Sequence, residues 1–197
     1  MKLVVLDTET TGLPPKELSA KTISNWPKVV QCSFIVVDTD ADIYQEHDFV
    51  IKVDDVGDST RFHGITQERS NMGCSFGEAY AALKEALMSD DTLVVGHNLS
   101  FDLRMIQAEC LRNGLSYAEP TSQYCTMKHG TDVCNIMTPK GYAKYPKLDE
   151  LFTHYFKTSA TNLHNSLFDS YATLCCFYKM FLFRDPPPKF LGLLTEN

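Results

Sequence analysis

Three short stretches rich in apolar residues lie in the first part of the chain, and we expect each of them to form a strand. They cover residues 2–7, 29–38 and 48–53. The first contains an uninterrupted apolar run at residues 3–6, a pattern typical of a strand that is buried on both faces of a sheet. A short polar stretch separates the second strand from the third, and this arrangement predicts a hairpin.

The stretch that joins these two strands, residues 38–49, resembles a calcium-binding loop in its first acids. Ile43 stands where the tight turn of such a loop needs glycine, and Phe49 stands where the bidentate glutamate belongs. We therefore interpret residues 38–49 as a hairpin turn and not as a calcium site.

After residue 75 the apolar positions recur at helical spacing. Ser75 and Glu78 form the S-x-x-E pattern of a capping box at the start of the first predicted helix. We expect helices at 75–88, 100–114, 145–156 and 166–183, and short strands at 92–97 and 122–127. Early strands followed by alternating helices and strands predict an α/β fold with a mixed sheet flanked by helices.

The length of 197 residues fits one domain with a sizeable core. We expect this domain over residues 1–185, followed by a proline-rich tail, 186–197, that packs on the domain or docks a partner. No apolar stretch approaches the roughly 20 residues of a membrane span, and too few apolar residues precede Asp7 for a secretory signal. We therefore expect an intracellular protein without a membrane partner, cytoplasmic, or nuclear if it comes from a eukaryote or virus.

Cysteine usage and net charge narrow the function classes. The seven cysteines include no C-x2-C pair, so neither a disulfide framework nor a zinc site is predicted. The net charge of −7 argues against a protein that coats nucleic acid through a broad basic surface. The same charge is compatible with a protein that binds the end of a nucleic-acid strand at a metal site.

Acidic residues follow the predicted strands. Asp7 and Glu9 are two positions apart, so their side chains should project from the same face at the end of the first strand. Asp102 falls in the first turns of the second predicted helix, and Asp169 falls at the start of the last helix with His164 just before it. Because ligands bind at the carboxyl ends of parallel strands, we expect these five side chains at one place.

Each of these residues also has a purely structural interpretation. An Asp-x-Glu pair at a strand end is commonly solvated, and Asp102 can complement the N-terminus of its helix. Asp169 completes an S-x-x-D capping pattern with Ser166, and a lone His164 is typical of a loop. Gathered together, however, four carboxylates about 5 Å apart repel by about 3 kcal/mol per pair at an effective dielectric near 20. Divalent cations relieve that repulsion, and all-oxygen ligation suits Mg²⁺ or Mn²⁺.

Four motifs occur in order along the chain. They are "DTETTG" (7–12), "FHGIT" (62–66), "GHNLSFD" (96–102) and "HNSLFDS" (164–170). In order, spacing and residue type they resemble the successive motifs of the DEDDh 3′–5′ exonucleases, including the H-x4-D of the histidine branch. The similarity extends from residue 2 to about residue 180. It implies a ribonuclease-H-like fold with a mixed sheet of about five strands.

The resemblance implies a chemistry for the acids and the histidine. Asp7, Glu9, Asp102 and Asp169 would hold two divalent cations, Mg²⁺ or Mn²⁺, and His164 would be the general base. Two such ions about 3.5–4 Å apart would activate a water and stabilise the leaving 3′-oxygen. The implied activity is release of nucleoside 5′-monophosphates from 3′ ends of single-stranded or frayed DNA or RNA. A polymerase or another replication or repair protein is the implied partner.

By the same resemblance, four residues fall where the family cradles the terminal nucleotide, namely Phe62, His63, Asn98 and Phe101. Stacking of an aromatic ring on a base tolerates any sequence, which suits a trimming enzyme. Core packing is the structural alternative for both phenylalanines.

The chain departs from the family pattern at two places that bear on its substrate class. Cys125 stands where many proofreading members carry an acid, and the insert at 14–28 is longer than in the most compact members. Two other functions remain as alternatives: a catalytically silent nucleic-acid or polymerase-binding module on the same fold, and a metal-dependent endonuclease. The complete set of acids favours an enzyme, because a silent module would have no reason to tolerate their repulsion.

Overall fold

A mixed sheet forms the centre of the protein, whose computed structural model describes residues 1–89 and 91–195. The strands are β1 (Lys2–Thr10), β2 (Val29–Asp38), β3 (Ile43–Val50), β4 (Thr92–Gly96) and β5 (Ser122–Cys125). Five strands lie in the order β3-β2-β1-β4-β5. β2 is antiparallel to β1 and β3, whereas β1, β4 and β5 are parallel. The predicted mixed sheet of about five strands is confirmed.

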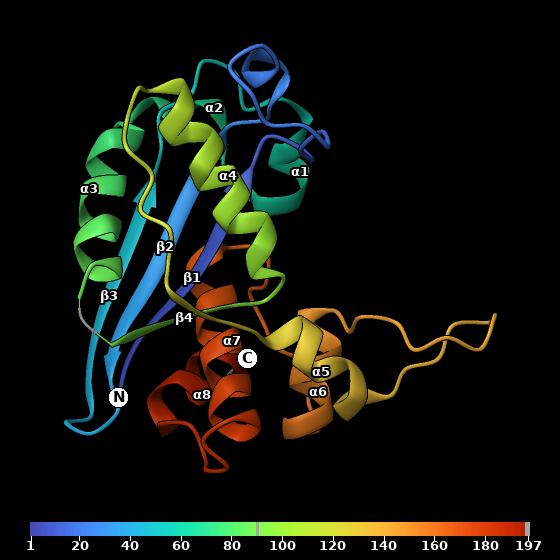
Figure 1. The fold of residues 1–197 in the computed structure, drawn as a ribbon. Coiled ribbons are helices and arrows are strands. Elements are labelled where there is room, and N and C mark those ends of the chain that lie inside the picture. Colours follow the sequence, from blue (N-terminus) through green and yellow to red (C-terminus); the bar gives the residue numbers. More distant parts are fainter. Residues whose placement is uncertain (90, 196–197) are drawn as a thin grey trace.

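Helices cover both faces of this sheet (Figure 1). α3 (Phe76–Leu87) and α4 (Leu99–Arg112) pack on one face. α6 (Leu148–Phe156), α7 (Ser166–Met180) and α8 (Pro188–Thr195) belong to the core on the other face. The shorter elements are η1 (Ile23–Asn25), η2 (Gly57–Ser59), α1 (Thr60–His63), α2 (Gln67–Asn71) and α5 (Thr126–Cys134). Over residues 1–89 and 91–195, no helix has the length and apolar character needed to cross a membrane.

The burial of β1 explains its apolar run. Leu3 and Val5 belong to one hydrophobic core cluster and Val4 and Leu6 to the other, and all four side chains are fully buried. Alternate side chains of a strand point to opposite faces. A strand with a core on each face has no solvated side, so every position in the run is apolar.

The third strand differs from its prediction. It spans Ile43–Val50 and not 48–53, because its pairing with β2 begins at Ile43 opposite Asp38. β3 is an edge strand, and most of its side chains are exposed or half-buried. Polar residues therefore fit it well. The hairpin turn is confined to residues 39–42 and does not extend over 38–49.

Two further boundaries differ from the sequence prediction. The strand predicted at 122–127 ends at Cys125, because Cys125 pairs with Gly96, the last residue of β4. α5 begins at the next residue. The apolar pattern of the sequence does not predict α5 itself. The helix predicted at 166–183 ends at Met180, before the three prolines at 186–188.

The C-terminal tail contains α8, which packs against α7. Phe190 and Leu194 are fully buried in the core cluster on that side of the sheet. The Thr161 N–H donates to the Leu194 carbonyl at 2.8 Å and joins the tail to the loop before α7. The boundary between a domain at 1–185 and a tail at 186–197 stays a prediction.

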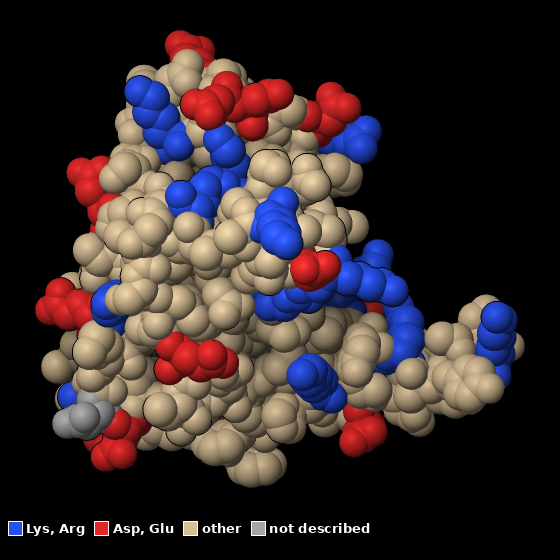
Figure 2. Space-filling view, turned by 45° about the horizontal axis from the view of Figure 1, so that its top comes forward, with Lys and Arg blue, Asp and Glu red and all other residues tan. Residues whose placement is uncertain are grey.

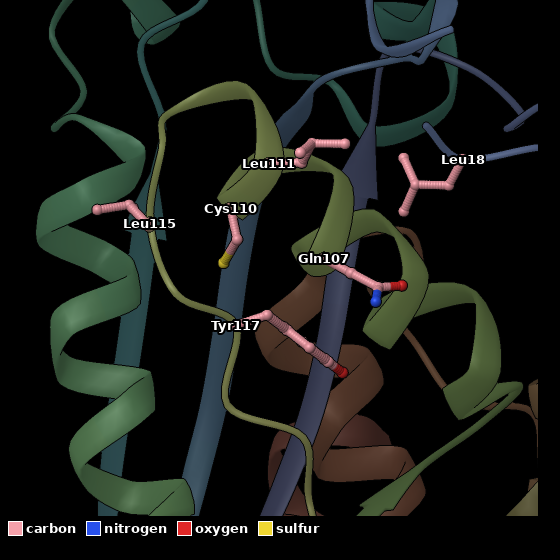
Figure 3. Close-up of a pocket in the computed structure, with 6 residues that line it drawn as sticks. All are labelled: Leu18, Gln107, Cys110, Leu111, Leu115 and Tyr117. Atoms are coloured by element: carbon pink, nitrogen blue, oxygen red, sulfur yellow. The ribbon is translucent and has the colours of Figure 1, made fainter. Parts of the chain in front are cut away.

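The insert at 14–28 packs along α4. The indole of Trp26 is buried, and its Nε1 donates to the Glu17 carbonyl at 2.7 Å. Arg112 of α4 donates to the Trp26 carbonyl at 2.9 Å. A cavity of about 330 Å³ lies between Leu18 of the insert and α4, lined also by Gln107, Cys110, Leu111, Leu115 and Tyr117 (Figure 3). No acid lines this cavity, so it is distinct from the site described next.

Candidate active site

Three carboxylates converge at the carboxyl end of β1. Asp7 and Glu9 lie on this strand, and Asp169 lies in the first turn of α7. One oxygen from each of the three lies within 4.8 Å of the other two. The two residues of β1 share a face because they are two positions apart. α7 brings the third acid to them by packing on β1 and β2.

Asp102 joins this group from α4. Its carboxylate is 2% exposed, and its Oδ1 accepts hydrogen bonds from the Thr8 N–H at 3.0 Å and the Thr8 hydroxyl at 2.8 Å. Thr8 stands between Asp7 and Glu9 on β1. The parallel pairing of β1 with β4 explains this contact, because it brings the start of α4 to the carboxyl end of β1.

Burial and mutual repulsion dominate the electrostatics of the four acids. Burial is the main reason that the pKa of Asp7 lies well above its usual value, with further contributions from Asp102, Asp169 and Glu9. Burial, followed by the charges of Asp169 and Asp102, raises the pKa of Glu9 to about 8. Burial also raises the pKa of Asp102 and of Asp169 to about 7. A cluster of hard oxygen donors that retains protons near neutrality fits divalent cations, which replace those protons.

His164 stands at the edge of the cluster. It is exposed, has a left-handed backbone with φ of 70°, and its N–H lies 3.3 Å from both oxygens of Asp169. The capping interpretation of Ser166 is wrong, since Asn165 is the N-cap of α7 and accepts from the Leu167 N–H. Asp169 therefore holds the loop before α7 and also faces the other acids.

The sequence pattern does not predict a polar network beneath α7, in which Gln31, Ser33 and Ser166 are buried and Asp48 is exposed. The Ser166 hydroxyl hydrogen-bonds the Ser33 hydroxyl of β2, and the Ser166 N–H donates to the Gln31 side chain at 3.3 Å. Gln31 and Ser33 both donate to Oδ1 of Asp48 on β3, at 2.7 and 2.8 Å. On β2, Gln31 pairs with Glu9 and Ser33 pairs with Asp7, so the network lies directly beside the acids.

One sequence signal points to this network. Gln31 and Ser33 are polar residues, two positions apart, inside the apolar run 29–38, and therefore lie on one face of a buried strand. Buried polar groups need partners. The identity of the partners, Asp48 and Ser166, depends on strand register and helix packing, which the sequence alone does not give.

A cavity of about 490 Å³ opens beside Glu9. Residues 10–13, 58–59 and 61–63 line much of it, and among them Leu13 is 87% exposed and Phe62 is 61% exposed. His63 also lines the cavity but is buried, with Nδ1 accepting from the Ile65 N–H and Nε2 bonded to Ser59. Burial lowers the pKa of His63, so its ring is neutral near pH 7.

The other two predicted nucleotide contacts lie outside the lining of this cavity. The ring of Phe101 is half-buried and packs against the core under α4, which accords with its structural alternative. Asn98 has a left-handed backbone, φ 67°, at the turn before α4, and its carbonyl accepts from the Phe101 N–H at 2.8 Å. The substrate-binding roles of Phe62, His63, Asn98 and Phe101 stay predictions.

Three solved structures share this fold. The nuclease domain of 3′hExo, described as a DEDDh family member bound to rAMP, has a TM-score of 0.68 at 12% identity, covering 94% of this chain and 96% of that one. Cell-death related nuclease 4 (CRN-4) has a TM-score of 0.67 at 16% identity, covering 93% and 64%. Exonuclease I from E. coli, in complex with an oligonucleotide, has a TM-score of 0.65 at 16% identity, covering 97% and 42%.

The chain spans less than two thirds of CRN-4 and less than half of exonuclease I. At these identities the likeness shows the fold, and the predicted ribonuclease-H-like α/β architecture is confirmed. No curated protein matches the sequence significantly. A family model described as "Exonuclease" (RNase_T) matches residues 4–177, most of the chain. The chain therefore belongs to this exonuclease family, as its DEDDh-like motifs predict.

Proposed function

We propose that this protein is a metal-dependent 3′–5′ exonuclease that releases nucleoside 5′-monophosphates from single-stranded or frayed ends. One observation carries the proposal: oxygens of Asp7, Glu9 and Asp169 lie within 4.8 Å of one another, with buried Asp102 joined to the same strand. Such a concentration of buried negative charge is unfavourable in a protein without a bound cation.

In this proposal Asp7, Glu9, Asp102 and Asp169 hold two Mg²⁺ or Mn²⁺ ions, for which carboxylate oxygens are the preferred ligands. The bound ions would supply an activated water and charge stabilisation for the leaving 3′-oxygen. The protein's own contribution is rigidity. β1, α4 and α7 all contribute side chains to the packed core, and the Thr8 and His164 N–H groups orient two of the carboxylates.

His164 is the proposed general base. The residue is exposed, so substrate and solvent can reach it. Its backbone N–H is hydrogen-bonded to Asp169, which fixes the backbone that carries the ring next to the acids. A neutral histidine ring nitrogen can accept the proton of the attacking water.

The cavity beside Glu9 is the proposed site for the terminal nucleotide. Its two exposed apolar side chains, Leu13 and Phe62, offer surfaces on which a base of any identity can stack. His63 is neutral and engaged with Ser59 and Ile65, so in this proposal it shapes the cavity wall.

The test is the shortening of oligonucleotides carrying a 5′ label. With Mg²⁺ or Mn²⁺ we expect a ladder of progressively shorter labelled products together with nucleoside 5′-monophosphates. We expect no products with EDTA or from Asp7→Asn. Matched DNA and RNA strands identify the preferred sugar.

Three outcomes contradict the proposal. Cleavage of circular single strands would indicate an endonuclease. Binding of oligonucleotides without hydrolysis in either metal would favour a silent binding module, including one that serves a polymerase. Full activity in EDTA would exclude the metal assignment.

A further inference from the structure

A hairpin projects from the protein between α5 and α6 (Figure 1, orange). We call residues 135–147 the arm. Met137 pairs with Ala143, the Thr138 N–H donates to the Tyr142 carbonyl at 2.8 Å, and Gly141 forms the turn with φ of 81°. These bonds give the arm a defined two-stranded shape that extends away from the core.

The base of the arm is hydrogen-bonded to His97, five residues before Asp102. The His97 Nε2 lies 3.0 Å from the carbonyl oxygen of buried Pro146, and its Nδ1 lies 3.0 Å from the Thr126 hydroxyl. Burial lowers the pKa of His97 to about 4, so the ring is neutral and its Nε2–H donates to Pro146. His97 directly precedes Asn98 and the start of α4. The C-terminal end of the arm, at Pro146, therefore lies beside the segment that leads into α4 and Asp102.

The arm displays large side chains without a core behind them. Tyr142 is 71% exposed, Tyr145 is 59% exposed and Met137 is 53% exposed. Single exposed apolar residues are ordinary on protein surfaces, but a group of them on one projecting element indicates a binding surface.

The charge of the arm is opposite to that of the whole protein. The chain carries a net charge of −7, yet residues 135–147 contain three lysines and no acid. Lys144 pairs with Glu150 of α6 at 2.7 Å. Lys140 and Lys147 are exposed, and within the described residues neither forms an ion pair. Figure 2 shows basic side chains, which on the arm are all lysines, along the arm and where it joins the body.

We propose that the arm binds the single-stranded nucleic-acid segment lying 5′ of the end being hydrolysed, with Tyr142 and Tyr145 stacking on bases and Lys140 and Lys147 contacting phosphates. Aromatic rings interleaved with cations are the combination that binds single strands without sequence preference. The location relative to the 3′ end rests on the proposed function. A strand long enough to reach the arm should therefore bind more tightly than one that fills only the cavity beside Glu9.

The experiment measures equilibrium binding in EDTA, where hydrolysis is not required, by fluorescence anisotropy of single strands of about 4 and about 16 nucleotides. Tyr142→Ala/Tyr145→Ala should weaken binding of the long strand by about tenfold or more and leave the short strand unchanged. Tyr142→Phe/Tyr145→Phe keeps both rings and should retain the affinity of the wild type. These exposed positions can be changed without disturbing the core.

The lysines are tested by salt dependence. Lys140→Gln/Lys147→Gln should reduce the slope of log affinity against log salt by about 1.4 for the long strand. The control is Lys2→Gln/Lys84→Gln, which removes the same charge from β1 and α3, where each ammonium group donates to a serine hydroxyl. The control should leave the slope nearly unchanged.

The arm proposal is overturned if the double alanine variant binds the long strand like the wild type, or if arm and control lysine variants change the slope equally. These outcomes are independent of catalysis. Loss of binding in the arm variants of a protein that shows no hydrolysis would support the arm and contradict the proposed function. Hydrolysis by the wild type together with normal binding by the arm variants would support the proposed function and contradict the arm proposal.

Discussion

The acid cluster and the arm differ both in the sign of their charge and in how far that charge is buried. The four acids are buried or half-buried at the ends of elements held by the core. Burial raises the pKa of each, and the charges of neighbouring acids raise the pKa of Asp7, Glu9 and Asp102 further. The arm presents exposed lysines and tyrosines on a hairpin supported mainly at its base. The contrast indicates two tasks. Groups whose mutual distances decide the chemistry are fixed in the core, whereas groups that only need to reach a flexible strand stand in solvent.

The largest effect is expected from Asp169→Asn. The amide keeps the size of the side chain and an oxygen that can accept from the His164 N–H, but it holds a hard cation poorly. Activity should fall by orders of magnitude, while the metal-free variant should be no less stable because repulsion among the acids is relieved. Steady-state kinetics and thermal unfolding in EDTA measure both. Near-normal activity with a lower melting temperature would make Asp169 a purely structural residue.

His164→Ala should slow hydrolysis by about 10²–10⁴-fold, the usual contribution of a positioned general base. Affinity for Mn²⁺ should stay close to that of the wild type, because His164 is not assigned as a ligand. His154→Ala on α6 is the matched control and should keep full activity. If calorimetric titration shows that His164→Ala loses Mn²⁺ binding, His164 belongs among the ligands.

Asp48→Ala removes the acceptor shared by Gln31 and Ser33 beneath α7. We expect kcat to fall by about 10–100-fold with KM nearly unchanged, because the network joins β2 to the start of α7 next to the acids. Asp48→Asn keeps an acceptor oxygen and should recover most of the rate. Equal losses in both variants would mean that the charge of Asp48, and not its hydrogen bonds, is what matters.

Phe62→Ala should raise KM more than it lowers kcat, because stacking on the terminal base is made in the ground state and the transition state alike. The expected loss is about 1–3 kcal/mol of binding. Phe101→Ala is the comparison: its half-buried ring packs on the core, so it should mainly lower the melting temperature. If Phe101→Ala raised KM and Phe62→Ala mainly lowered the melting temperature, Phe101 would be the stacking ring and Phe62 the structural one.

The smallest effect concerns the stability of the metal-free protein against pH. The raised pKa values mean that, between about pH 4 and pH 8, the folded acids hold protons that the unfolded chain has released. Their contribution to the free energy of unfolding therefore falls as pH rises through this range. In EDTA, the melting temperature of Asp169→Asn should fall less between about pH 5 and pH 8 than that of the wild type. Parallel curves would show that Asp169 does not share in the repulsion.

The sequence predicts those parts that are encoded locally. The apolar run at 3–6 indicates a strand buried on both faces, Ser75 and Glu78 do form a capping box, and the two-residue spacing of Asp7 and Glu9 does put them on one side. These features depend only on strand and helix periodicity and on cap chemistry.

The features that the sequence did not predict depend on tertiary pairing. β3 carries polar residues because it is an edge strand, and its start at Ile43 follows from its register with β2. The partners of Gln31, the contact of His97 with Pro146 and the projection of the arm all join segments distant in sequence. Periodicity along the chain carries no information on such contacts.

The central claim is that the four acids form a divalent-cation site, and calorimetric titration with Mn²⁺ tests it most directly. The raised pKa values predict that binding near pH 7 releases protons, which is measured by repeating the titration in buffers with different ionisation enthalpies. We expect proton release in the wild type, and both weaker binding and less release in Asp169→Asn. Absence of Mn²⁺ binding, or binding without proton release, would contradict the account.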